Sequence, residues 1–378
     1  MENIEGAFSL IGWKFDWVAL HVILPVGISF YTFQALSYTI DVYRGNIKPT
    51  RDVIEFFAYI SFFPQLVAGP IERATSLLPQ FQKERKFDYS QAVDGMRQML
   101  WGFFKKLVIA DNCAVVVNSY WGEYNEYTGL SLLAIGVLFT FQIYGDFSGY
   151  SDIAIGCARL FGIKLMRNFN FPYFSKSIPE FWRKWHMSLM TWFRDYIYFP
   201  LGGSRCARWK VIRNTLIVFF VSGLWHGANW TFICWGMYHA LLISIFILLG
   251  INTKPKETAK RLLPTLKELL QMCITFFLVV VGWILFRAEN MDQACQLIYR
   301  MFTTFFDDFQ IRQGKVFLIY GFAMLAIEWL QRDKQHALQL PDKGIFKLRA
   351  VRWGVYVLLA TLAITLTGAS QTFIYFQF

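Results

Sequence analysis

Long stretches without charged residues constrain this chain more than any other feature. Residues 130–144, 230–250 and 269–286 contain no Asp, Glu, Lys or Arg. A helix needs about 20 predominantly apolar residues to cross a hydrocarbon core of about 30 Å. Of all residues 55% are hydrophobic and 17% are charged, against about 25% charged in a typical soluble domain. The sequence therefore predicts an integral membrane protein with several spans.

The apolar pattern predicts an all-α integral membrane fold, a multi-span helical bundle that forms one domain over residues 1–378. Eight spans are expected, at 17–38, 96–119, 129–150, 212–227, 229–250, 268–286, 315–330 and 352–370. Segment 53–69 is apolar but polar residues interrupt it, so we expect a re-entrant hairpin there. Residues 252–261 are expected to form a flexible linker. Lys105 and Lys106 fall inside the second span, so they should snorkel to the surface, or the span starts later.

Basic residues lie mostly on one predicted side of the membrane. Five regions on that side hold 32 of the 37 Lys and Arg residues: 44–51, 70–106, 159–213, 254–267 and 331–352. Positively charged loops stay in the cytoplasm, so both termini are predicted to be extracytoplasmic. The net charge of +11 does not indicate nucleic-acid binding, because no nucleic-acid-binding motif accompanies it.

Residues 159–211 form a basic segment rich in Trp and Pro, predicted to lie as amphipathic helices at the cytoplasmic membrane interface. Trp182, Trp185, His186 and Leu189 would share one face of a continuous helix. An aromatic belt at the interface explains that face, and a functional His186 is the alternative. The basic charges suit the phosphates of a coenzyme or an acidic carrier protein, and they equally suit anionic lipid headgroups.

His226 is the strongest candidate for a functional residue. It follows one apolar run and precedes another, in the sequence Ser222-Gly-Leu-Trp-His-Gly-Ala-Asn-Trp230. Gly227, Ala228 and Asn229 should break the helix at membrane depth, which is tolerated where the backbone is buried in protein or lines a cavity. A helix-packing turn with a hydrogen-bonded histidine remains the alternative interpretation.

The other histidines have simpler interpretations. His21 begins an apolar run and is expected at the interface. His239 lies inside a span, where a structural hydrogen bond is favoured over chemistry. His336 lies in a charged loop and is expected to be solvated.

Several kinds of chemistry lack their sequence signals. There is no P-loop, no H-E-x-x-H motif and no G-x-S-x-G motif, and the six cysteines are scattered without paired spacing. We therefore expect neither a metal site nor a tightly bound cofactor. Asp146 and Asp152 do not share a helical face well, which argues against a paired-carboxylate site.

An ordered set of short motifs resembles the membrane-bound O-acyltransferase family, in its bacterial alginate O-acetyltransferase branch. The matching stretches are Leu24-Pro-Val-Gly-Ile-Ser-Phe-Tyr-Thr-Phe-Gln34, Tyr38-Thr-Ile-Asp-Val-Tyr-Arg-Gly45, Phe63-Pro-Gln-Leu-Val-Ala-Gly-Pro-Ile-Glu-Arg73, Phe181-Trp-Arg-Lys-Trp-His-Met-Ser-Leu189, Arg194-Asp-Tyr-Ile-Tyr-Phe-Pro-Leu-Gly-Gly203, Gly223-Leu-Trp-His-Gly-Ala228 and Trp283-Ile-Leu-Phe-Arg-Ala288. They run in family order from residue 24 nearly to the C-terminus. Members of this branch carry further N-terminal spans, which are expected to be absent here.

The resemblance implies a funnel-shaped helical bundle around a central channel, in a bacterial inner membrane. By motif, the family's invariant histidine falls on His226 and its second histidine on His186. The implied reaction transfers an acetyl group from a cytoplasmic thioester, such as acetyl-CoA, to an extracytoplasmic polysaccharide or cell-wall polymer. A separate periplasmic partner acetyltransferase is also implied.

Acyl transfer to a hydroxyl needs a base, and a neutral imidazole suits that role because its reference pKa of about 6.5 lies near working pH. We therefore predict His226 as the base, with His186 orienting a substrate group or stabilising the oxyanion. Three alternatives stay open: D-alanyl transfer toward teichoic acid, a membrane transporter, and an inactive scaffold for an acetylating partner.

Overall fold

The computed structural model describes residues 27–251, 261–307, 309–311, 314–368 and 371–374, and within these it is helical without a strand. In chain order the elements are α2 (Ile28–Tyr43), α3 (Val53–Ile60), α4 (Ala74–Gln82), α5 (Tyr89–Phe103), the π-helical η1 (Phe104–Ala110), α6 (Asp111–Trp121), the 3₁₀ turn η2 (Tyr124–Glu126), α7 (Gly129–Leu160), η3 (Pro172–Phe174), α8 (Ile178–Lys184), α9 (Met187–Phe193), the π-helical η4 (Arg194–Tyr198), α10 (Arg208–His226), α11 (Trp230–Leu248), α12 (Leu266–Arg287), α13 (Met291–Thr303), α14 (Gly314–Leu330), η5 (Gly344–Lys347) and α15 (Arg349–Thr365). The predicted all-α fold is confirmed for this part of the chain.

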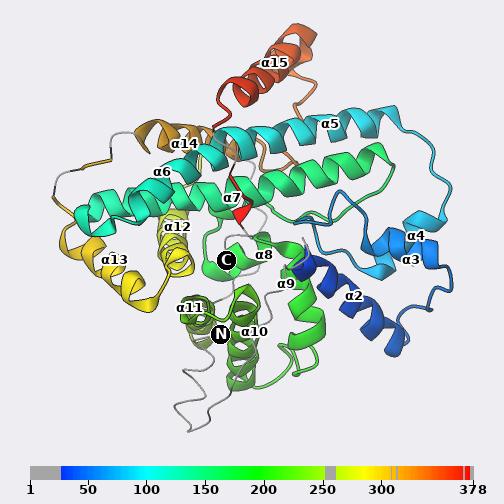
Figure 1. Ribbon diagram of the computed structural model, residues 1–378, viewed down its shortest axis with the longest axis horizontal. Helices are drawn as coiled ribbons and strands as arrows, with labels where there is room; N and C mark the ends of the chain where they lie inside the picture. The colour runs from blue at the N-terminus through cyan, green and yellow to red at the C-terminus, as the bar shows by residue number, and fades with distance from the viewer. Residues whose placement is uncertain (1–26, 252–260, 308, 312–313, 369–370, 375–378) are drawn as a thin grey trace, which may run out of the picture.

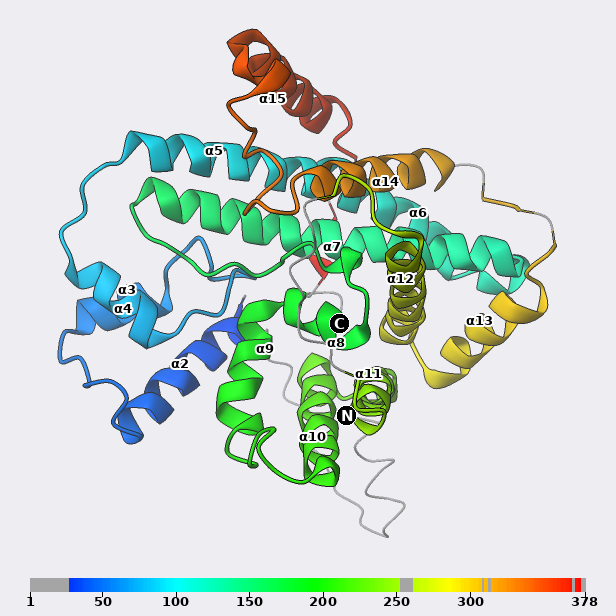
Figure 2. The ribbon, with the colours of Figure 1, turned by 180° about the vertical axis from the view of Figure 1, so that it is seen from behind.

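The longest helix, α7, lies along the continuous helical stretch α5–η1–α6, and the two run side by side across the molecule (Figures 1 and 2). On one side of this pair lie α8 to α11, and α14 and α15 lie on the other (Figure 1). Helix α7 is buried along most of its length because side chains from both sides pack onto it. It is the central helix of the described fold.

Glycines allow α5 and α7 to approach closely. A Cβ atom on Gly95 would lie 2.6 Å from the carbonyl oxygen of Gly156, and one on Gly102 would lie 2.6 Å from that of Gly149. The partners are seven residues apart on each helix, so both contacts lie on one face of each helix. Small residues at such positions permit the van der Waals packing that holds helices together in a membrane.

We expect Gly95→Ala to destabilise the protein by about 1–3 kcal/mol, because the added methyl group must push the two backbones apart. Gly354→Ala is the matched control, since nothing lies within 4 Å of a Cβ atom at that position of α15. The control should be neutral or about 0.5–1 kcal/mol more stable, as alanine favours a helix over glycine. Thermal unfolding in detergent micelles would measure both, and equal melting curves would contradict the close approach.

Three helices in the described residues are long and apolar enough to cross a membrane: α7, α11 and α12. They coincide with three of the eight predicted spans. Helices α10, α14, α15 and the α5–η1–α6 stretch also fall on predicted spans, although these helices are shorter or less apolar. Residues 17–26 of the first predicted span, His21 and residues 252–260 of the predicted linker lie outside the described residues.

The prediction of snorkelling to the membrane surface is wrong for Lys105. Lys105 and Lys106 both lie in η1, where the helix widens to π-helical hydrogen bonding. Lys105 is 2% exposed, and Lys106 binds Asp111 at 2.8 Å and Asp146 at 2.7 Å. Lys105 is therefore held inside the protein, while the side chain of Lys106 stays 22% exposed.

Segment 53–69 begins with the short helix α3, which Asp52 caps by accepting hydrogen bonds from the backbone N–H groups of Ile54 and Glu55. The chain then turns through residues 63–69 and leads to α4, which packs against α3. The structure thus places a helix and a turn where the re-entrant hairpin is predicted.

Residues 178–193 do not form the predicted continuous amphipathic helix. The helix breaks at Trp185 and His186, between α8 and α9. Trp182, Trp185 and Leu189 are each at most 5% exposed, so they pack in the protein core rather than forming an aromatic belt at the interface.

Candidate functional site

His226 is the last residue of α10, where the predicted helix break is confirmed. Gly227 follows with a φ of 154°, a conformation that favours glycine. Asn229 then caps α11 by accepting a hydrogen bond from the N–H of Thr231 at 3.1 Å, and its amide donates to the carbonyl of Glu289 at 2.8 Å. The turn therefore holds His226 between two helices that pack against each other.

His186 lies at the break between α8 and α9, in the left-handed helical region with φ 45° and ψ 52°. This conformation is uncommon for residues other than glycine, and such residues cluster at functional sites. The ring is 4.6 Å from that of Phe147 in an edge-on contact and 6.3 Å from that of Phe30 in a stacked one. The imidazole is thus buried among aromatic rings.

The two histidines lie 40 residues apart in the sequence, and the structure brings them to one cavity. Its walls come from both short helices, from the α10–α11 pair and from α12. The lining residues are Trp182, Trp185, His186, Leu189, Met190, Ser222, His226, Trp235 and Trp283. Most of this lining is aromatic or aliphatic, and the two imidazoles are its main proton-transferring groups. The cavity can therefore support acid–base chemistry in an apolar setting.

A hydrogen-bond network supports His186 from behind. Its Nδ1 lies 3.1 Å from Oδ1 of Asn168, and the hydroxyl of Ser188 donates to the same oxygen at 2.9 Å. Nε2, the other ring nitrogen, is buried without a hydrogen-bond partner among the described residues. Asn168 escaped the sequence analysis because no motif marks it, and only the fold places it beside His186.

His239 does not make the structural hydrogen bond predicted for it. Neither of its ring nitrogens has a hydrogen-bond partner in the described part of the chain. Its ring packs edge-on against Trp182 at 5.0 Å and Trp235 at 5.6 Å, two residues that line the cavity. His239 thus lies behind the wall of the site.

The prediction of a solvated His336 is also wrong. Its side chain is buried, and Nε2 lies 3.1 Å from Oδ1 of Asp94. Burial raises the pKa of Asp94, but hydrogen bonds from His336 and Gln339 and the charge of Arg159 outweigh it and hold that pKa at about 2. The loop that carries His336 folds back onto α5, which a charged sequence pattern does not reveal.

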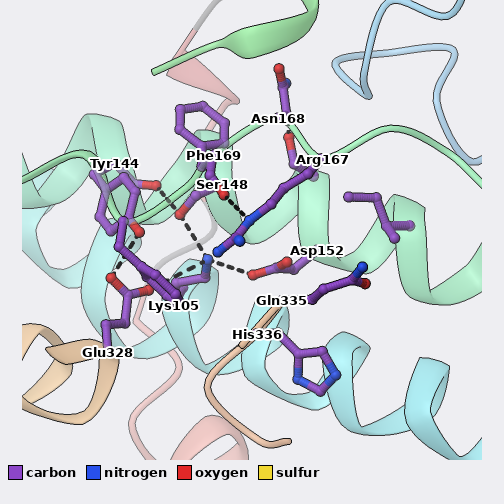
Figure 3. A pocket seen from close by; sticks show the side chains of 13 residues that line it. Lys105, Tyr144, Ser148, Asp152, Arg167, Asn168, Phe169, Glu328, Gln335 and His336 are labelled. Carbon is purple, nitrogen blue, oxygen red and sulfur yellow. Dashed lines mark hydrogen bonds and ion pairs between the residues drawn. The ribbon is translucent and has the colours of Figure 1, made fainter. Parts of the chain in front are cut away.

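A second cavity contains a buried cluster of charges that the sequence analysis missed (Figure 3). Nζ of Lys105 lies 2.6 Å from Asp152, 2.8 Å from the hydroxyl of Ser148 and 4.0 Å from Glu328. Glu328 also accepts a hydrogen bond from the hydroxyl of Tyr144 at 2.8 Å. The isolated acid Glu328 within an apolar run was the signal that could have revealed the cluster.

The sequence argued against a paired-carboxylate site at Asp146 and Asp152, and the structure places the two carboxylates on different partners. Asp146 binds Lys106 and Asp152 binds Lys105, so each aspartate neutralises a different ammonium group. In addition, no group of three or more His, Cys, Asp or Glu residues in the searched part of the chain could hold a metal ion.

Comparison with known proteins relates this chain to a family. The model of the membrane-bound O-acyltransferase family matches residues 47–281. The probable alginate O-acetylases of Pseudomonas syringae pv. tomato and Pseudomonas aeruginosa are 41% and 44% identical to the chain over 313 and 287 residues, 83% and 76% of this chain. The peptidoglycan O-acetyltransferase of Helicobacter pylori is 34% identical over 320 residues, 78% of this chain. The chain spans 58%, 53% and 59% of the lengths of these relatives.

Proposed function

The chain belongs to the membrane-bound O-acyltransferase family, and from this premise we propose that it transfers an acetyl group from a cytoplasmic thioester to hydroxyl groups of an extracytoplasmic polysaccharide or cell-wall polymer. One observation carries the proposal: His186, at the break between α8 and α9, and His226, at the end of α10, line the same cavity. The similarity to alginate and peptidoglycan O-acetylating relatives supports the choice of acyl group and acceptor.

In the proposed reaction, His226 is the general base. It takes the proton of the acceptor hydroxyl as that oxygen attacks the thioester carbonyl carbon. The C–O bond forms, the C–S bond breaks, and the leaving thiolate recovers the proton from the imidazolium. His186 orients a substrate group or stabilises the oxyanion. The apolar lining excludes water, which would otherwise compete for the acyl group.

The proposal also covers how the substrates reach the cavity. We place the protein in the bacterial inner membrane with both termini outside the cytoplasm and with a central channel that passes through this cavity. Acetyl-CoA, or another acyl thioester, would approach from the side of the basic 159–211 segment. The polymer would approach from the opposite side, assisted by a periplasmic partner acetyltransferase.

Membrane vesicles that contain the chain provide the test. They would be supplied with labelled acetyl-CoA and separately with alginate or peptidoglycan, and label on the purified polymer would be measured. We expect labelled acetate on one of the polymers. In parallel vesicles supplied with a labelled D-alanyl thioester and teichoic acid, transfer to that polymer instead would favour the teichoic-acid reaction. Uptake of label without any transfer would contradict an acyltransferase.

His186→Ala should lower this transfer by up to about 100-fold, less than the loss of the base, because the acceptor remains bound but is poorly oriented. His186→Asn distinguishes loss of the imidazole from a change in backbone conformation. Asparagine tolerates the left-handed conformation but has no imidazole. Both variants should lose activity at equal membrane abundance. Full activity of His186→Asn would show that the imidazole does not contribute.

A further inference from the structure

Asn168 is placed to control which nitrogen of His186 carries the proton. Its side chain is fully buried, and its Nδ2 donates to the hydroxyl of Ser151 at 3.2 Å. Its Oδ1 receives hydrogen bonds from the backbone N–H of Ser188 at 3.3 Å and from the Ser188 hydroxyl at 2.9 Å. The Nδ1 atom of His186 lies 3.1 Å from the same oxygen.

The backbone N–H of Ser188 determines which end of the Asn168 amide faces His186. A backbone N–H can only donate, so the Asn168 atom that faces it must be the oxygen and not the nitrogen of the amide. An amide oxygen can only accept, so a hydrogen bond across the 3.1 Å contact requires the proton on Nδ1. The Ser188 hydroxyl also lies 3.4 Å from Nδ1, but its shorter bond of 2.9 Å goes to the amide oxygen. The proton of neutral His186 therefore resides on Nδ1.

The backbone holds this network in place. The carbonyl of Asn168 accepts a hydrogen bond from the N–H of Met187 at 2.9 Å, and the N–H of Asn170 donates to the carbonyl of Lys184 at 2.9 Å. These bonds clamp the extended segment around Asn168 against the break between α8 and α9. Asn168 and the histidine ring thus share one rigid frame.

We propose that Asn168 is a positioning residue that holds His186 as the tautomer protonated on Nδ1, so that Nε2 accepts a hydrogen bond from a hydroxyl group of the acceptor. This inference rests on the proposed function for the identity of that hydroxyl. The unprotonated Nε2 is buried without a partner among the described residues, and His186 lines the cavity shared with His226. A neutral ring in this tautomer cannot donate to an oxyanion, so of its two predicted roles His186 orients the substrate.

The tautomer can be measured without any acyl transfer. Histidine labelled with ¹⁵N in the ring would be incorporated into the full chain in detergent or lipid, and His186→Gln would assign the signal among the five histidines. We expect the His186 spectrum to show a protonated Nδ1 and an unprotonated Nε2. A proton on Nε2 of the wild-type ring would overturn the inference, even if no variant of Asn168 folds.

Asn168→Ala should release the ring into a mixture of tautomers and lower acetyl transfer by up to about 100-fold. Ser151→Ala is the matched control, because it removes the bond to Nδ2 but leaves Oδ1 and its Ser188 partner in place. The control should keep the Nδ1 tautomer.

An unchanged tautomer in Asn168→Ala would overturn the positioning role. If the tautomer changes as expected but wild-type vesicles transfer no acyl group, the tautomer inference stands and the proposed function fails.

Discussion

His226→Ala is expected to lower acyl transfer by about 100- to 10,000-fold, the contribution of a general base to such a reaction. The imidazole ends α10 and lines the cavity, and its ring lies 5.1 Å from that of Trp235 and 4.9 Å from that of Phe286. Alanine leaves the helix end intact because Gly227 and Asn229 make the turn. The loss should therefore appear in the rate of transfer and not in the amount of folded protein.

The measurement is labelled acetate on the polymer, at equal abundance of the chain in the membrane. His336→Gln is a suitable control histidine, since His336 is buried but bonds Asp94 and does not line the cavity of His226. It should retain most of the transfer activity. Undiminished acetylation by His226→Ala would show that another group takes the proton.

Lys105→Met is expected to destabilise the protein by about 3–5 kcal/mol, because removing one partner leaves buried charges without compensation. Lys105 is 2% exposed, and its ammonium group lies 2.6 Å from Asp152 and 4.0 Å from the buried Glu328. Methionine matches the length of the lysine stem, so packing changes little and the lost charge dominates. Thermal unfolding in detergent and accumulation in the membrane would measure the effect.

A surface ion pair provides the comparison for this prediction. Lys176 lies 3.2 Å from Glu268, and both side chains are about a quarter exposed. Lys176→Met should cost only about 0–1 kcal/mol, since water solvates the remaining charge. Adding Asp152→Asn and Glu328→Gln to Lys105→Met should recover much of the lost stability by neutralising the unpaired carboxylates. Equal losses for the two lysines would contradict a buried charge cluster.

Sequence reasoning worked where the local pattern decides the structure. Helices α7, α11 and α12 coincide with three predicted spans because a long apolar stretch has few ways to satisfy its backbone in a membrane except as a helix. The break after His226 was also predictable, because Gly227 and Asn229 favour a turn and a helix cap without help from distant residues.

Reasoning from the sequence failed where a distant partner determines the environment. Lys105 was expected at the membrane surface because its neighbours in the sequence do not reveal the buried Glu328 beside it. Glu328 lies on α14, 223 positions further along the chain. His336 was expected in water because its partner Asp94 lies on α5. Burying a charge is costly unless a partner compensates it, and a local pattern does not reveal the partner.

The candidate site also depends partly on local sequence and partly on distant partners. Hydrophobic length and turn-forming residues act over a few neighbours, so a membrane-embedded helical protein and a functional His226 can be predicted from the residues alone. The fold joins His186 to the same cavity and places Asn168 behind its ring. Hydrogen bonds and cavity walls form between helices far apart in the chain, so the packing of those helices decides which groups meet.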